Sequence, residues 1–129
     1  MIQIKKEIES ICGKVIDFPG FGYLFKINNI DCMCMKTSKK DQLRFVVPCA
    51  KKIPMSNQNE YMNRINQVNK ELRYVKILLL DTGCIVVNYD YKLVSNANYK
   101  EIVYHIIRVI SFAVTYISDR INDSTEKNI

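Results

Sequence analysis

Residues 74–91, with the sequence YVKILLLDTGCIVVNYDY, decide the fold. Two runs rich in β-branched and aromatic residues, 74–80 and 84–91, flank the tripeptide Asp81-Thr82-Gly83. Glycine suits the left-handed position of a three-residue loop, so the stretch predicts a β-hairpin. A second hairpin is predicted upstream, with strands over 23–27 and 30–36, because Asn28 and Asn29 between them tolerate positive φ.

Helices are predicted on both sides of these strands. The first has apolar residues at i, i+4, i+7 and i+11, namely Ile4, Ile8, Ile11 and Val15. The second starts near Ser56 or Asn57, and its apolar face is Tyr61, Ile65, Val68 and Leu72. The third runs from about 99 to 121 with Asn98 as its cap, and it is apolar nearly all round. Such a helix is buried on more than one side, by the sheet and the first helix or by a second subunit.

One more strand is predicted over 43–47, which Pro48 should end or move to a sheet edge. The element order is therefore α-β-β-β-α-β-β-α. Strands joined by short turns predict an α+β fold, an antiparallel sheet with helices packed on it. A chain of 129 residues, 48% hydrophobic and 25% charged, forms one domain. We assign it to residues 1–121, followed by a polar C-terminal tail over 122–129.

Charge and cysteine usage limit the possible functions. Nineteen basic against thirteen acidic residues leave a net charge of +6, and the densest basic cluster is interrupted by Asp41; it comprises Lys36, Lys39, Lys40, Arg44, Lys51 and Lys52. A solvated lysine-rich edge is the favoured interpretation, and nucleic-acid binding is the less favoured one. Five cysteines without framework spacing predict a cytoplasmic chain with reduced thiols. The longest uncharged stretch, 109–118, is about half of what a membrane span needs, so no membrane association is predicted.

Three sets of residues suggest chemistry without establishing it. The Asp81-Thr82-Gly83 turn is similar to that of dimeric aspartic proteases, but the chain lacks the later glycines which that fold requires. Cys32 and Cys34 would lie on one strand face, where packing is favoured over zinc binding. His105 is the single histidine, favoured as a packing residue over a nucleophilic partner of a cysteine. We therefore predict no catalytic residue, cofactor or metal, and no enzyme; an enzyme would need a deep polar pocket around His105 or Cys34.

The second predicted helix carries a stripe of amides, Asn59, Asn63, Asn66 and Asn69. Asparagine is a mediocre helix former, so the stripe calls for a reason. Either it reflects an asparagine-rich composition, or the side chains make hydrogen bonds across an interface or to the following loop.

Residues 65–76, INQVNKELRYVK, followed by Asp81-x-Gly83 and by 85–90, IVVNYD, resemble the YbjN-like family of bacterial proteins, regarded as sensory transduction regulators. Members of that family share the fold of type III secretion chaperones, whose element order matches the predicted one. The resemblance implies a small non-enzymatic protein, often a homodimer, that binds other proteins through strand addition or apolar grooves. It places five residues near a dimer interface: Tyr61, Ile65, Val68, Tyr74 and Lys76.

The sequence therefore predicts a cytoplasmic homodimer that acts as a protein-binding or regulatory module. The alternative is a secretion-type chaperone that holds one unfolded client protein. In either case the partner is a protein, which the sequence does not identify.

Overall fold

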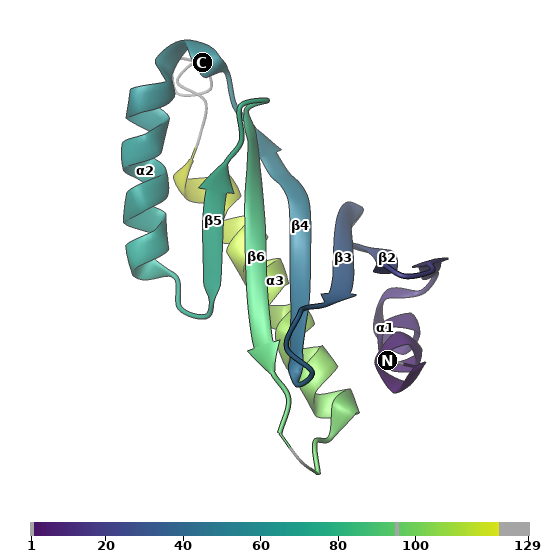
Figure 1. The fold of residues 1–129 in the computed structure, drawn as a ribbon. Coiled ribbons are helices and arrows are strands. Elements are labelled where there is room, and N and C mark those ends of the chain that lie inside the picture. Colours follow the sequence, from purple (N-terminus) through teal and green to yellow (C-terminus); the bar gives the residue numbers. More distant parts are fainter. Residues whose placement is uncertain (1, 95, 122–129) are drawn as a thin grey trace.

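The computed structural model describes residues 2–94 and 96–121, except for the side chains of Asn57 and Gln58. Three α-helices, one short 3-10 helix and six strands lie within this part of the chain (Figure 1). In chain order they are α1 (Ile2–Cys12), β1 (Ile16–Phe18), β2 (Gly22–Ile27), β3 (Ile30–Lys36), β4 (Gln42–Lys52), η1 (Met55–Asn57), α2 (Gln58–Glu71), β5 (Val75–Leu79), β6 (Cys84–Lys92) and α3 (Tyr99–Arg120). The predicted tail over 122–129 lies outside the described residues.

The six strands form one antiparallel sheet in the order β1-β2-β3-β4-β6-β5. The predicted α+β fold is confirmed, with one strand more than expected. That strand, β1, pairs with β2 alone among the strands in the described part of the chain, and all three of its residues are exposed. A three-residue strand without a buried face leaves no periodic pattern in the sequence, and the sequence analysis predicts no strand there.

Both predicted hairpins are present. Asn28 and Asn29 have φ values of 51° and 67°, as a two-residue turn between β2 and β3 requires. Gly83 has φ 90° in the turn between β5 and β6, where the Leu80 N–H donates to the Cys84 carbonyl at 2.9 Å. A Cβ atom on Gly83 would lie 2.4 Å from the Ile53 carbonyl oxygen, so the turn also packs closely against the chain before η1.

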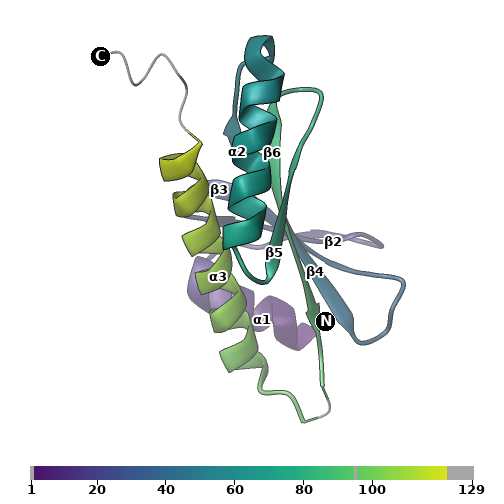
Figure 2. The same cartoon turned by 90° about the vertical axis from the view of Figure 1, so that its left-hand side faces the viewer.

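All three helices lie on the same side of the sheet, as Figure 2 shows. Helix α3 crosses β4 and β6, α1 contacts α3 and β2, and α2 lies along β5. Side chains of the covered face alternate with those of the open face; on β4, Leu43, Phe45 and Val47 are buried, whereas Arg44 and Val46 are partly exposed. The core therefore forms a single layer between the helices and one face of the sheet.

Helix α3 is the central element of that core. Asn98 caps it as predicted, with its side-chain oxygen accepting from the Glu101 N–H at 3.2 Å. Among the described residues, α3 is the one helix that is long and apolar enough to cross a bilayer by length and composition. Core helices pass the same test, and here Ile102, Ile106, Ile110 and Ile117 are buried inside the molecule.

Strand β4 differs from the prediction in its length, and it contains a cysteine that was expected to be reduced. It continues through Pro48 to Lys52 instead of ending there, because its register with β6 shifts between Val47 and Lys51. A bulge accommodates a proline inside a sheet, since the ladder is interrupted there. The bulge also brings Cys49 next to Cys84, and the two form a disulfide with Cα atoms 4.9 Å apart. The expectation of five reduced thiols is therefore wrong for this pair.

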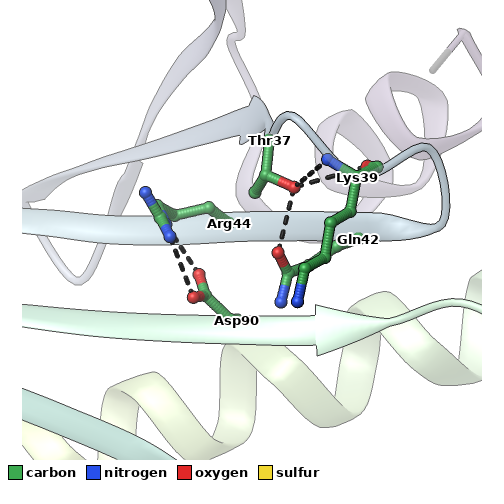
Figure 3. Close-up of polar contacts among 5 residues, drawn as sticks. All are labelled: Thr37, Lys39, Gln42, Arg44 and Asp90. Carbon is green, nitrogen blue, oxygen red and sulfur yellow. Dashed lines mark hydrogen bonds and ion pairs between the residues drawn. The ribbon is translucent and has the colours of Figure 1, made fainter.

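On the open face, β4 and β6 are joined by an ion pair (Figure 3). Arg44 donates from Nε and Nη2 to the two carboxylate oxygens of Asp90, at 2.7 and 3.0 Å. This pairing lowers the pKa of Asp90. Near the end of the same strands, the Thr37 hydroxyl accepts from the Lys39 N–H at 3.1 Å and lies 3.0 Å from the Gln42 side-chain oxygen, as Figure 3 also shows.

The basic cluster seen in the sequence is divided by the fold. Lys36, Lys39 and Lys40 lie around the β3–β4 turn, whereas Lys51 and Lys52 lie at the far end of the 11-residue β4. Arg44, between the two groups, is already paired with Asp90. This arrangement favours solvated strand ends over one basic patch.

Candidate binding groove

A groove opens where the chain turns from α2 into β5, opposite the middle of α3. Its volume is about 630 Å³, within the usual range for binding pockets. One wall comes from the end of α2 and the start of β5, and the other from α3; the lining residues are Glu71, Leu72, Arg73, Tyr74, Val75, Tyr104, His105, Arg108, Val109, Phe112 and Ala113.

Three large rings around the groove are exposed to solvent. Tyr74 is 68% exposed, Tyr104 53% and Phe112 62%. Tyr74 stacks on Tyr89 with ring centroids 6.4 Å apart and meets the edge of His105 at 6.1 Å. Isolated exposed apolar residues are ordinary, but several around one concave surface are typical of a binding site.

Tyr74 is held in the groove by an unusual turn. Its φ is +74°, a region that bulky L-residues rarely adopt. The Val75 N–H donates to the Arg73 carbonyl across it at 2.9 Å, which closes a γ-turn with a positive φ at its centre. Such turns are rare and strained, and strained residues concentrate at functional sites. The sequence gives no sign of this turn, because Arg-Tyr-Val contains no turn-forming residue.

The charges at the groove are mostly positive. Arg73 lies beside Tyr74 on one wall, and Arg108 lies over the Tyr104 ring on the other, 5.6 Å from its centroid. The acidic Glu71 already has partners, because one of its oxygens accepts from Gln67 at 3.0 Å and the other accepts from the Tyr116 hydroxyl.

The amide stripe of α2 has a structural role at Asn69. Its side-chain Nδ2 donates to the Ile77 carbonyl at 3.0 Å, and its Oδ1 accepts from the Ile77 N–H at 2.8 Å. Ile77 lies on β5, the last strand of the sheet, so Asn69 occupies both backbone groups that a further strand would use at this residue. The sequence predicted hydrogen bonds across an interface or to the following loop, whereas Asn69 bonds to strand β5 beyond that loop.

Of the five residues that were predicted to lie near a dimer interface, three are buried and two are exposed. Tyr61, Ile65 and Val68 are each no more than 2% exposed and pack in the core of a single chain. They are core residues of the single chain, and their position near a dimer interface stays a prediction. Tyr74 and Lys76 are exposed, and Tyr74 lines the groove.

Of the residues considered for chemistry, His105 lies apart from Cys32 and Cys34. Cys32 and Cys34 are buried on the covered face of β3, and desolvation raises the pKa of the Cys34 thiol to about 12. His105 is exposed in the groove, which no cysteine lines. Within residues 2–94 and 96–121, no group of three or more histidine, cysteine and acidic side chains is placed to hold a metal. Cys32 and Cys34 both pack in the hydrophobic core.

Sequence comparisons find no relatives, since no family model and no curated protein matches the chain. Solved structures of similar fold are found, among them "Crystal structure of YbjN, a putative transcription regulator from E. coli". The two structures align with a TM-score of 0.67 over 92% of this chain and 90% of the other, at 10% sequence identity. The chain has a YbjN-like fold.

Sequence reasoning missed most of the groove. Arg73, Tyr104 and Arg108 were not singled out as site residues, and Phe112 was noted only as lying outside the apolar stripe of the last helix. The available signal was that α3 has aromatic residues outside its apolar stripe. Aromatic residues on a second face of a helix indicate a binding partner only when the rest of the fold leaves that face exposed. The sequence does not show which face is exposed.

Proposed function

We propose that this protein is a non-enzymatic protein-binding module of the YbjN-like kind, and that its partner docks in the groove between α2 and α3. The groove carries the proposal, because three exposed rings converge there and one of them is held by a strained γ-turn. Rigid aromatic side chains are the anchors that protein interfaces use most. The neighbour's description as a transcription regulator supports a regulatory role for such binding.

The test is a pull-down from native lysate with three tagged baits: wild type, the double variant Tyr74→Ala with Phe112→Ala, and a matched double variant, Leu78→Ala with Val94→Ala. Leu78 and Val94 are 57% and 65% exposed and lie outside the groove. We expect the same protein partner on wild type and on the matched variant, and none on the groove variant. Equal capture by all three baits would contradict a role for the groove.

A homodimer remains part of the proposal, with its interface near the exposed Tyr74 and Lys76. Ile65→Asp would not test it, because Ile65 is 1% exposed and a buried carboxylate would unfold the chain. Light scattering of wild type and of Lys76→Glu is the better test. We expect a dimer that the variant weakens; a monomeric wild type would overturn this part.

The second candidate is a secretion-type chaperone, which the β1 end of the sheet favours. Among the described residues, the outer edge of β1 has no neighbouring strand, and Ile16, Phe18 and Phe21 are 44%, 48% and 65% exposed around it. A client segment could add there as a further strand. Phe18→Ser with Phe21→Ser should then abolish binding of a single client while leaving the groove intact. Retained client binding would exclude this candidate.

The cytoplasmic location expected from the sequence stays a prediction. Disulfides are rare in that compartment. Thiol labelling in intact cells will show whether Cys49 and Cys84 are paired there.

A further inference from the structure

We propose that the groove receives an amphipathic helix of the partner protein, with carboxylates next to its apolar anchor residues. This inference rests on the proposed function and adds the chemistry and conformation of the partner. Three observations support it. They are the two arginines of the groove, the hydrogen bonds that Glu71 already accepts, and the hydrogen bonds by which Asn69 occupies the outer edge of β5.

Each wall of the groove carries an arginine and an exposed ring. On α3, Arg108 lies one helical turn from both Tyr104 and Phe112. On the other wall, Arg73 directly precedes Tyr74. Within the described part of the chain, neither arginine has a carboxylate at ion-pair distance. A segment that inserts an apolar side chain between the walls therefore brings its flanking residues close to a guanidinium.

The charge of the rim favours an acidic ligand over a basic one. Glu71 is the single acidic lining residue, and both of its oxygens already accept hydrogen bonds, from Gln67 and Tyr116. These donors are neutral, so Glu71 keeps its charge, and two guanidinium groups against one carboxylate give the rim a net positive charge. Guanidinium groups bind carboxylates through paired, charge-assisted hydrogen bonds, which give orientation as well as affinity.

The shape of the groove favours a helix over a strand. Strand β5 forms one side of this region, but Asn69 occupies the backbone groups of Ile77 at its outer edge. Strand addition at this point is thus blocked. Between Tyr104 and Ala113, α3 presents about 13 Å of wall at 1.5 Å per residue, enough to face roughly two and a half turns of a helix. Helix-in-groove binding uses apolar anchors one or two turns apart over such a length.

The experiment selects helical peptides from a phage-displayed random library against the full-length protein and measures the binding of the selected peptides. The charge variant is Arg73→Gln with Arg108→Gln. Its matched control is Lys6→Gln with Lys14→Gln, which removes the same charge from exposed residues outside the groove. The double variant Tyr74→Ala with Phe112→Ala, called the groove variant, shows whether a peptide binds in the groove.

We expect the selected peptides to carry Asp or Glu within one turn of an aromatic or large aliphatic residue. They should bind the charge variant about tenfold more weakly than wild type and the matched control. Raising the salt concentration should weaken binding to wild type and have little effect on the charge variant. Proline placed between the anchors of a selected peptide should remove binding.

The outcomes separate the inference from the proposed function. One outcome is that the selected peptides fail to bind the groove variant, lack acidic residues and bind the charge variant as well as wild type. This outcome would overturn the acidic partner and leave the groove as the binding site. Binding that survives the proline substitution would overturn the helix. Selected peptides that all bind the groove variant normally would overturn the proposed function itself.

Discussion

Tyr74 combines three properties at one residue. Its backbone is in the left-handed region, its ring stacks on Tyr89, and most of its surface faces solvent in the groove. A strained backbone costs on the order of 1–3 kcal/mol and persists only where the surrounding structure imposes it. Here the helix-to-strand connection spans only Leu72 to Tyr74, which leaves the chain few other ways to enter β5.

Replacing Tyr74 should therefore affect stability and binding differently. Tyr74→Gly relieves the backbone strain, so we expect a free energy of unfolding within about 1 kcal/mol of wild type, together with loss of partner binding. Tyr74→Val, which is β-branched, should lose binding and also destabilise by about 1 kcal/mol or more. Urea denaturation and peptide binding measured on both variants check this. Equal stability of the two variants would argue against strain at this position.

Asn69 differs from the neighbouring asparagines in having two backbone partners on β5. We expect Asn69→Ala to lower the free energy of unfolding by about 1–3 kcal/mol, since the Ile77 N–H and carbonyl both lose their partner. Asn66→Ala is the matched control, because Asn66 is exposed on the same helix and should change stability by less than about 0.5 kcal/mol. Chemical denaturation of the two variants makes the comparison; similar effects would show that Asn69 has no special role.

At the scale of elements, the pairing of β4 with β6 should depend on pH through Asp90. The hydrogen bonds from Arg44 are the main cause that lowers the pKa of this carboxyl in the folded chain. A carboxyl with a lowered folded pKa stabilises the fold above its unfolded pKa, near 3.9, and loses that contribution as pH falls through the folded pKa. The ion pair is therefore present at neutral pH and lost in strong acid.

The corresponding variant is Asp90→Asn. Because Arg44 and Asp90 are 41% and 30% exposed, we expect a loss of no more than about 1 kcal/mol at pH 7. The difference from wild type should vanish at low pH, once Asp90 is protonated in both states. Denaturation curves over a pH series measure this difference in the free energy of unfolding. Asp31→Asn is the control, because it removes the more exposed ion pair between Lys26 and Asp31. A difference that persists in acid would exclude the ion pair as its cause.

The elements that the sequence predicts are those determined by local chemistry. Two asparagines with positive φ, a glycine in a three-residue loop and a capping asparagine each specify a turn or a helix start without distant contacts. Strand β1 was missed because only its pairing with β2 defines it. The continuation of β4 past Pro48 was missed because a bulge depends on the register of the neighbouring strand.

The site was harder to predict than the fold for the same reason. An apolar face on α2 indicates burial, but whether the sheet or a second subunit covers it is a property of the assembled chain. Ile65 and Val68 are core residues of the chain, while Arg73 and Arg108 line one groove because α2 ends opposite the middle of α3.

At the scale of the whole molecule, the disulfide joins residues 35 positions apart. Closing a loop of that length can stabilise a fold by up to about 4 kcal/mol, mainly by restricting the unfolded chain. We expect alkylation of the denatured, unreduced protein to label Cys12, Cys32 and Cys34 only, and all five cysteines after reduction. Reduction should also lower the free energy of unfolding. Labelling of all five cysteines before reduction would contradict the disulfide.

The two ends of the sheet are not equivalent. At β5, α2 and the Asn69 side chain close the last strand, whereas β1 presents an edge without a neighbour among the described residues. A molecule with one closed end can gain strands on one side only. Two copies joined through β1 would form a continuous sheet with a sealed strand at each end, so growth by strand addition stops at a pair instead of propagating into a fibre.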